Sequence, residues 1–234
     1  MIYFSRIFLT TLALVSATDY CSKTLCPLKK SHVACGHSGE FARICPPDAQ
    51  HNEKRDLVAG GGLKRFEPAA RMATMQWDEE LASLAALNVK QCEMKHDQCR
   101  NTDTFRYAGQ SLSGPSTKGF SVDSSKTIRK AINNWFNEHK DCNMKIINSF
   151  PGNDKVYFGH FTAMVIDKNI RIGCAASRYT LDGWNKFLFA CNYAYNNMME
   201  QSIYKPSDKP ASECKAGRNP DYKNLCSTAE PYYI

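Results

Sequence analysis

The sequence predicts an α+β domain, and three of its features support this fold class. The segment 123–139 carries apolar residues at i, i+3, i+4 and i+7, the strongest helical periodicity in the chain. Two alternating apolar runs, 170–176 and 187–193, flank turn-forming residues at 181–184, which indicates an antiparallel hairpin. The chain also contains eleven cysteines, an ordered framework that cytosolic proteins rarely carry. We therefore expect helices and a hairpin in a protein that disulfides stabilise outside the cell.

The N-terminus predicts export. Residues 1–6 form a short, positively charged start, residues 7–15 form an apolar core, and Val15-Ser16-Ala17 supplies small residues for cleavage. We interpret residues 1–17 as a signal peptide, because this apolar stretch is too short to span a membrane. No later segment of the sequence reaches the about 18 apolar residues that a transmembrane helix needs. The mature chain is expected to be secreted, extracellular and soluble, without a membrane span.

Residues 18–47 predict a cysteine-rich extension that has no core of its own. This segment shows little periodicity, ends in Pro46-Pro47 and contains four cysteines, so cross-links must hold it. Within it, a loop bracketed by Cys26 and Cys35 has a basic tip, Leu28-Lys29-Lys30. The tip is either simply solvated or part of a contact surface.

The charge of the chain limits its partners. The formal net charge is +7, with lysines and arginines dispersed along the sequence. This is either a solvated basic surface or a means of attracting anionic surfaces and ligands, such as glycosaminoglycans or carboxylates. No aromatic–basic pattern typical of RNA binding is present, so nucleic acid is not an expected partner.

Two further helices are expected before the periodic segment. The first covers residues 48–59, because Asp48 is a suitable N-cap and Gly60-Gly61-Gly62 would end the helix. The second begins at the N-cap Asp78 and continues to about Cys92, with its apolar residues on one side.

The hairpin and the tail can be cross-linked. Cys174 and Cys191 occupy alternating positions whose side chains point inward in the two runs, so a disulfide between them could bridge the runs. Residues 205–234 are rich in proline, lysine and serine and contain Cys214 and Cys226. We interpret this stretch as a small disulfide-tied tail rather than as a second folded domain.

The apolar run 159–165 carries one imidazole, His160. A lone histidine there is most often a satisfied core residue, but other polar side chains could join it. Glu138 lies three residues after Trp135, on or beside the buried face of its helix. Two imidazoles, an amide and a carboxylate could therefore converge on one cleft: His96, Gln110, Glu138 and His160.

Seven short motifs occur in order over about residues 45–195. They are His51-Asn52-x-x-Arg55, Trp77-Asp78-x-Glu80-Leu81-Ala82, Cys92-x-x-x-His96-Asp97-x-Cys99-Arg100, Ala108-Gly109-Gln110-Ser111, Trp135-x-x-Glu138, Gly159-His160-Phe161-Thr162-x-Met164-Val165 and Cys191-Asn192-Tyr193. On these motifs the chain resembles the insect antigen 5 branch of the cysteine-rich secretory, antigen 5 and pathogenesis-related (CAP) superfamily. More narrowly, it is similar to salivary antigen 5 proteins of horse flies.

The resemblance implies a three-layer α-β-α sandwich. The CAP domain would cover residues 48–204, with the extension 18–47 before it and the tail 205–234 after it. The resemblance also implies the disulfides Cys21–Cys35, Cys26–Cys99, Cys45–Cys92 and Cys174–Cys191, and Cys214–Cys226 would then close the tail. Cys142 is left over, either as a small buried hydrophobe or as an exposed reactive thiol.

The resemblance also assigns the cleft. His96, Glu138 and His160 match three of the four polar positions of the superfamily, and Gln110 stands where many members have Glu. Neutral His96 and His160 could ligate zinc, with Glu138 nearby and water completing the shell, but two ligands make a weak site. The alternative is a buried hydrogen-bond network that ties helices to the sheet, and the two interpretations can coexist. No cofactor is required.

No catalytic residue is predicted. Gln110 cannot take or give a proton, so half of any paired-carboxylate mechanism is missing. Neither a Gly-x-Ser-x-Gly elbow nor a His-Glu-x-x-His zinc motif is present, and a serine protease would need an unmarked serine. The sequence therefore favours binding over turnover.

Three functions compete. The first is sequestration of a small hydrophobic or amphipathic ligand, such as an eicosanoid or fatty acid, as some members of the superfamily do. The second is contact with a host platelet or cell-surface receptor. Horse-fly relatives can carry Arg-Gly-Asp in the first cysteine-bracketed loop, but this chain has Leu28-Lys29-Lys30 there, which disfavours integrin-type inhibition of platelet aggregation. The third is an extracellular scaffold recognised as an allergen. We expect a monomeric salivary protein that interferes with host haemostasis or inflammation by binding.

Overall fold

The computed structural model describes residues 48–120, 123–152 and 157–234. The expected signal peptide 1–17 and extension 18–47 lie outside the described residues. The same holds for the loop tip Leu28-Lys29-Lys30 and for four of the cysteines expected in disulfides, Cys21, Cys26, Cys35 and Cys45.

A five-stranded sheet forms the centre of the fold, in the order β1-β4-β5-β2, with β3 pairing to the outer part of β5. β1 is parallel to β4, and the other pairs are antiparallel. The turn Asp182-Gly183 joins β4 to β5 with positive φ at both residues, 51° and 74°, the backbone that a two-residue hairpin turn requires. The expected hairpin is therefore confirmed. The strands are β1 (Gln76–Trp77), β2 (Gly109–Ser113), β3 (Ser116–Lys118), β4 (Arg171–Leu181) and β5 (Trp184–Tyr193).

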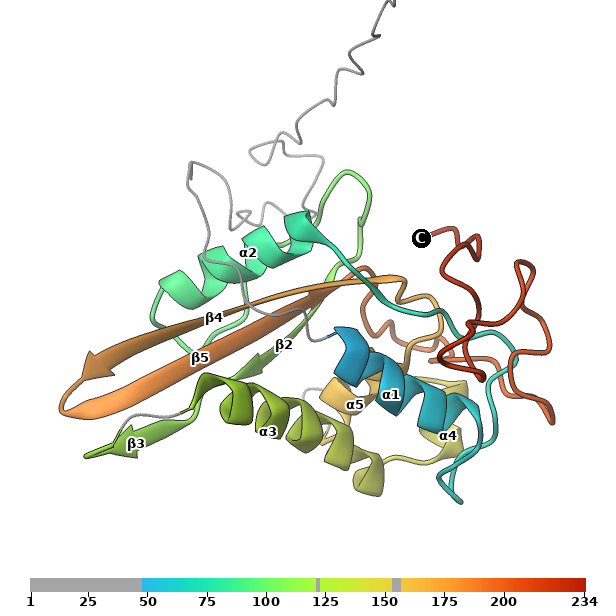
Figure 1. Ribbon diagram of the computed structural model, residues 1–234, viewed down its shortest axis with the longest axis horizontal. Coiled ribbons are helices and arrows are strands. Elements are labelled where there is room, and N and C mark those ends of the chain that lie inside the picture. The colour runs from blue at the N-terminus through green and yellow to red at the C-terminus, as the bar shows by residue number, and fades with distance from the viewer. Residues whose placement is uncertain (1–47, 121–122, 153–156) are drawn as a thin grey trace, which may run out of the picture.

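Helices cover both faces of this sheet. Figure 1 shows α2 on one side and the other helices on the opposite side, which gives the expected three-layer α-β-α sandwich. The helices are α1 (Asp48–Ala59), α2 (Glu79–Lys90), α3 (Ser124–Asn137), the 3₁₀ turn η2 (Glu138–Asp141), α4 (Met144–Asn148) and α5 (Gly159–Val165). Within the described ranges, no helix is both long enough and apolar enough to cross a membrane.

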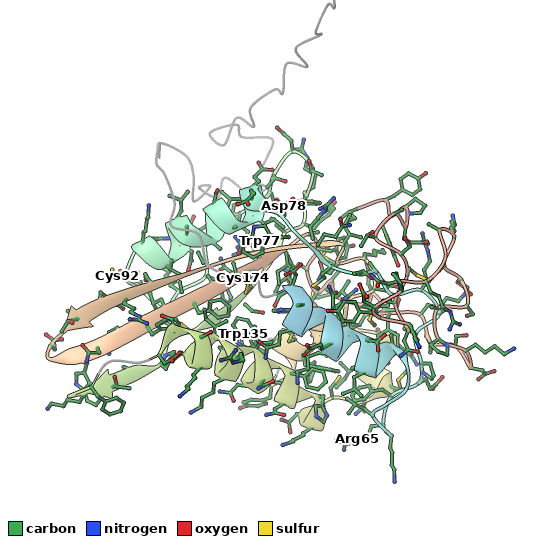
Figure 2. All side chains as sticks on the ribbon, viewed as in Figure 1. Arg65, Trp77, Asp78, Cys92, Trp135 and Cys174 are labelled. Carbon is green, nitrogen blue, oxygen red and sulfur yellow. A yellow bond between two sulfur atoms is a disulfide. The ribbon has the colours of Figure 1, made fainter. Side chains whose placement is uncertain are left out.

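Helices α2 and α3 begin at the expected aspartates. The Asp78 carboxylate accepts a hydrogen bond from the Leu81 amide at 2.9 Å and starts α2. Asp123 does the same for Lys126 at 2.9 Å and starts α3. Figure 2 shows Asp78 at one end of α2 and Cys92 beyond the other. These starts and ends agree with the predicted helices to within two residues.

The two faces of the sheet are packed differently. The α3 face carries a large aromatic and aliphatic core that includes Trp135, Phe161 and Phe189. The α2 face is packed mostly by small residues, so the helix lies close to the strands. At Gly173 of β4, a Cβ atom would lie 2.1 Å from the backbone nitrogen of Ala82 in α2, so only glycine fits there.

Arg55 joins α1 to the rest of the core. Its guanidinium is fully buried and donates hydrogen bonds to the carbonyls of Ala73, Met164 and Ile166 at 2.7–3.0 Å, and to that of Asp167 at 3.4 Å. Burial lowers the pKa of Arg55 to about 10. Every bond goes to a backbone carbonyl, so this one side chain connects α1, the segment before β1 and the end of α5.

Two disulfides are formed among the described residues. Cys174 and Cys191 face each other in register across β4 and β5, with 4.1 Å between their Cα atoms, and Cys214 pairs with Cys226 in the tail. Cys99 is also disulfide-bonded. Its partner is none of the other described cysteines, so the expected Cys26–Cys99 pair is not described further.

The structure corrects the expected Cys45–Cys92 pair, because Cys92 forms no disulfide here. Cys92 takes the left-handed position that ends α2, with φ 58°, and its exposed thiol points back to the carbonyl of Lys90. A disulfide needs facing Cβ atoms and Cα atoms less than about 7 Å apart. Cys45 lies outside the described residues, so the structure describes only the free thiol of Cys92.

Cys142 is buried rather than exposed. Burial is the main cause that raises the pKa of its thiol, to about 12, so the thiol stays protonated and unreactive. Of the two interpretations left open by the sequence, the structure supports the small buried hydrophobe.

The tail 205–234 packs on the domain with little regular structure of its own. Its Cys226 amide bonds to the Met72 carbonyl at 2.8 Å, and its Asn224 amide bonds to the Asp56 carboxylate at 2.8 Å. The Glu230 carboxylate pairs with Arg71 at 2.6 Å. The tail is thus fastened along its length to α1 and to the segment before β1.

Candidate metal and ligand cleft

Glu138 holds His160 in place from the 3₁₀ turn that follows α3. One carboxylate oxygen lies 2.6 Å from the imidazole Nδ1 of His160. The other accepts hydrogen bonds from the backbone amides of His160 at 2.8 Å and Phe161 at 3.2 Å. One carboxylate therefore caps the start of α5 and also fixes the orientation of the ring.

Aromatic stacking holds the same imidazole from its face. The His160 ring stacks on Trp135 with 5.6 Å between centroids, and Trp135 stacks on Phe189 of β5 at 5.3 Å. The Trp135 indole N–H donates to the carbonyl of Leu112 at 3.2 Å. This column anchors His160 to the sheet through α3, on which Figure 2 labels Trp135.

Gln110 of β2 holds the second imidazole. Its side-chain oxygen lies 2.8 Å from Nδ1 of His96. Its side-chain nitrogen donates to Asp97 at 2.7 Å and to Asn192 of β5 at 3.0 Å. The amide orientation assigns the proton to Nδ1 of His96 and leaves Nε2 as the free lone pair.

Asp97 and Asn192 extend this network into the fold. Asp97 accepts a hydrogen bond from Asn88 of α2 at 2.7 Å, and its backbone carbonyl accepts one from Arg100 at 2.6 Å. The Asn192 side chain donates to the Leu81 carbonyl in α2 at 3.2 Å. The loop that carries His96 is thus tied to α2 and β5, as the network interpretation expects.

The two imidazoles lie within electrostatic reach of each other, because His160 is among the groups that lower the pKa of His96. His96 is exposed as a residue, yet partial desolvation of its ring is the largest cause that lowers its pKa below the ordinary value. The hydrogen bond with Gln110 raises that pKa, and nearby Arg100 and His160 lower it further. His96 is therefore neutral at physiological pH, the form that ligates metals.

The donor set fits a weakly held divalent ion. With Nδ1 of both imidazoles hydrogen-bonded to an acceptor, each Nε2 is left for a metal, the arrangement typical of metal-binding histidines. In this arrangement Glu138 orients His160 rather than binding the ion itself. No group of three or more His, Cys, Asp or Glu side chains in the described part of the chain is placed to hold a metal. Only two protein ligands would hold an ion here, so water would complete its shell.

A separate cavity of about 250 Å³ lies where the tail crosses the β1–β4 edge of the sheet. Its lining includes Gln76, Arg171 and Tyr232 but none of the four cleft residues. It is smaller than the about 300–1,000 Å³ of typical ligand pockets.

Sequence reasoning named the four cleft residues but missed the side chains that support them. Asp97 and Asn192 occur in the sequence motifs, but the sequence alone assigns them no role. A polar residue in an otherwise apolar strand was the available signal for Asn192. For the stack, the signal was Trp135, one helical turn before Glu138.

Comparison with known proteins gives consistent matches along the chain. The model of the cysteine-rich secretory protein family (CAP) matches residues 49–193. Venom allergen-1 of Aedes aegypti is 35% identical, with 95% of this chain and 93% of the relative covered. Antigen 5 like allergen Cul n 1 of Culicoides nubeculosus is 39% identical over 78% of this chain and 92% of the relative.

A horse-fly relative and a solved structure also match this chain. Tabinhibitin 3 of Tabanus yao is 31% identical, with 96% of this chain and 95% of the relative covered. The crystal structure of NaASP2 with Zn²⁺ aligns with a TM-score of 0.63 at 29% identity, covering 76% of this chain and 92% of that one.

Proposed function

This chain belongs to the cysteine-rich secretory protein (CAP) family, and from that membership we propose that it is a secreted, non-enzymatic antigen 5-type protein that acts by binding. Similarity to proteins named venom allergen, antigen 5 like allergen and Tabinhibitin supports this proposal. None of these names denotes an enzyme. The proposal extends to release in saliva and to interference with host haemostasis or inflammation.

The cleft chemistry carries the non-enzymatic part of the proposal. Gln110, a neutral amide, occupies the position beside His96 where a second carboxylate would be needed for paired acid–base work. The Glu138 carboxylate is engaged by three hydrogen bonds from α5. Both groups position imidazoles, which suits holding a ligand. Hydrolysis of a peptide or ester substrate that His160→Gln abolishes would contradict the proposal.

A divalent metal such as zinc is the first ligand to test. NaASP2, which shares the fold, was crystallised with Zn²⁺. Calorimetric titration of the mature protein with zinc chloride should show weak binding that His96→Gln or His160→Gln removes. Glu138→Gln should weaken binding about 10- to 100-fold, because it loosens the orientation of His160. Glu213→Gln, in the exposed pair with Lys205, is the matched control and should bind as the wild type does.

Sequestration of an amphipathic lipid with a carboxylate head is the finer part of the proposal. The net charge of +7 supports attraction of such a head group, and each buried methylene would add about 0.8 kcal/mol. The cavity near the tail is too small to be offered as the lipid site, and its lining includes none of the four cleft residues. Native mass spectrometry for co-purifying lipid, followed by titration with leukotrienes and fatty acids, tests this part. No saturable binding at micromolar lipid would remove it.

Inhibition of platelet aggregation is the second candidate, and the similarity to Tabinhibitin 3 favours it. The sequence contains no Arg-Gly-Asp, so an integrin mechanism would need another surface. A platelet aggregation assay that compares the wild type with the double variant Lys29→Gly, Lys30→Asp tests whether the loop at Leu28-Lys29-Lys30 or another surface is responsible for inhibition. Inhibition only by the double variant would show that the wild-type loop does not engage the integrin.

A further inference from the structure

The hairpin of β4 and β5 extends beyond the helix that covers it. On the α2 side of the sheet, Leu188 is buried beneath the helix, and the Tyr179 hydroxyl still reaches the carbonyl of Cys92 at the helix end. The next pair toward the turn is Leu181 and Trp184, which face each other across the strands. Figure 1 shows this end of the hairpin projecting past α2. Among the described residues, no helix therefore covers the outermost part of the sheet on this face.

Large apolar side chains gather at that uncovered end. Leu181 is 51% exposed and Trp184 is 41% exposed. Phe120, just after β3, is 64% exposed, and its carbonyl is fastened to the hairpin by a 2.9 Å hydrogen bond from Asn185. Exposed apolar residues scattered singly are ordinary, but three on one projecting tip indicate a contact surface.

Positive charge surrounds the same residues. Lys118 pairs with Trp184 in the sheet, and its ammonium lies 6.0 Å from the centroid of the indole ring. The ammonium of Lys186 lies 5.8 Å from the same centroid. Residues 116–120 and 178–186 contain three basic side chains, Lys118, Arg178 and Lys186, against one acidic side chain, Asp182. We call Lys118, Phe120, Leu181, Trp184 and Lys186 the hairpin tip.

We propose that the hairpin tip docks the protein onto membranes that carry anionic lipid head groups. An indole ring flanked by ammonium groups suits the boundary between head groups and acyl chains, where tryptophan is enriched and lysine keeps its charge in water. Phe120 and Leu181 would enter the apolar layer below. A sulfated polysaccharide would match the lysines but would leave both apolar side chains in water, so exposed apolar groups favour a membrane. This inference does not depend on the proposed cleft function.

The test is co-sedimentation of the mature protein with vesicles of phosphatidylcholine alone or mixed with phosphatidylserine. The wild type should bind the mixed vesicles more tightly, and added salt should weaken that binding. Lys118→Gln with Lys186→Gln should reduce it by about 20- to 30-fold, at about fivefold for each lysine near an anionic surface. Leu181→Ser with Trp184→Ser should reduce it at least about tenfold, because both side chains would leave the apolar layer.

Matched controls separate the tip from general charge and hydrophobicity. Lys209→Gln with Lys223→Gln removes two exposed lysines from the tail, and Tyr233→Ser removes a side chain that is 93% exposed. Both should bind vesicles as the wild type does. None of the replaced side chains is in the core, so the tip variants should melt at the same temperature as the wild type. An unchanged melting temperature then shows that they are folded.

Three outcomes would overturn the proposal. The wild type could fail to bind the mixed vesicles, or the tip variants could bind like the controls. Alternatively, heparin binding could depend on Lys118 and Lys186 while Leu181→Ser with Trp184→Ser changes neither heparin nor vesicle binding. That last result would assign the surface to a polysaccharide.

Discussion

The inner and outer ends of the β4–β5 hairpin share the same two strands but have opposite environments. At the inner end, Cys174, Cys191 and Tyr193 are almost completely buried between helices on both faces. At the outer end, Leu181 and Trp184 lie on the α2 side of the sheet, beyond the end of that helix, and remain exposed. The alternation of residues thus specifies a strand and its faces, whereas the length of the covering helix decides which apolar residues become core.

Two glycines give the largest expected contrast between these ends. Gly173→Val places a Cβ atom 2.1 Å from the backbone of α2, so the helix must leave the sheet, and we expect a loss above about 4 kcal/mol or failure to fold. Gly183→Val at the turn meets no neighbour within 4 Å and is strained only by its φ of 74°, which costs about 1–2 kcal/mol. Urea unfolding of both variants measures the difference. Equal losses would mean that helix contact does not distinguish the two ends.

The disulfide at the inner end should give the next largest effect. Replacing Cys174 and Cys191 together by alanine opens a loop of 17 residues and should cost about 3 kcal/mol. The tail pair, Cys214 and Cys226, closes a loop of 12 residues, so its double alanine variant should lose a similar amount. Thermal unfolding under oxidising conditions compares the two. A much larger loss for the first pair would show that the inner end depends on the bridge beyond its effect on the unfolded chain.

Two asparagines of β5 make a finer comparison. Asn192→Ala at the inner end leaves the Gln110 amide and the Leu81 carbonyl without their partner, which should cost about 1–3 kcal/mol. Asn185→Ala at the outer end removes two exposed hydrogen bonds, to Phe120 and from Thr180, that water can replace, and the change should stay within about 0.5 kcal/mol. Chemical denaturation gives both values. A loss of more than about 1 kcal/mol for Asn185→Ala would place the outer end in the cooperative core.

The smallest effect is expected for Leu181→Ala. Its side chain is 51% exposed and lies beyond the end of α2, so stability should change by less than about 0.5 kcal/mol. Differential scanning calorimetry is sensitive enough to measure this. Truncating a buried leucine to alanine costs about 2–5 kcal/mol. A loss of that size for Leu181→Ala would mean that another part of the chain covers this end.

Much of this fold could be predicted because its signals are local. The caps Asp78 and Asp123 mark the starts of two helices, and Asp182-Gly183 marks the hairpin turn. The segment 159–165 could not be assigned to a helix or strand in advance. It is a short apolar run, and Phe158 before it provides no side-chain cap.

The candidate site was less predictable because its contacts are long-range. Gln110 and Asn192 are 82 residues apart in sequence, and Glu138 and His160 are 22 apart. The resemblance to a family brought the four cleft residues together, but only the coordinates assign a hydrogen-bond partner to each ring nitrogen. Residue types alone could not separate the ligating nitrogen of His96 from the one that Gln110 occupies.

The buried guanidinium of Arg55 also limits how molecules can reach the interior. Lifting α1 from the domain would break hydrogen bonds to four carbonyls and leave a cation in an apolar setting, at a cost of several kcal/mol. This helix is therefore a fixed wall and cannot serve as a gate.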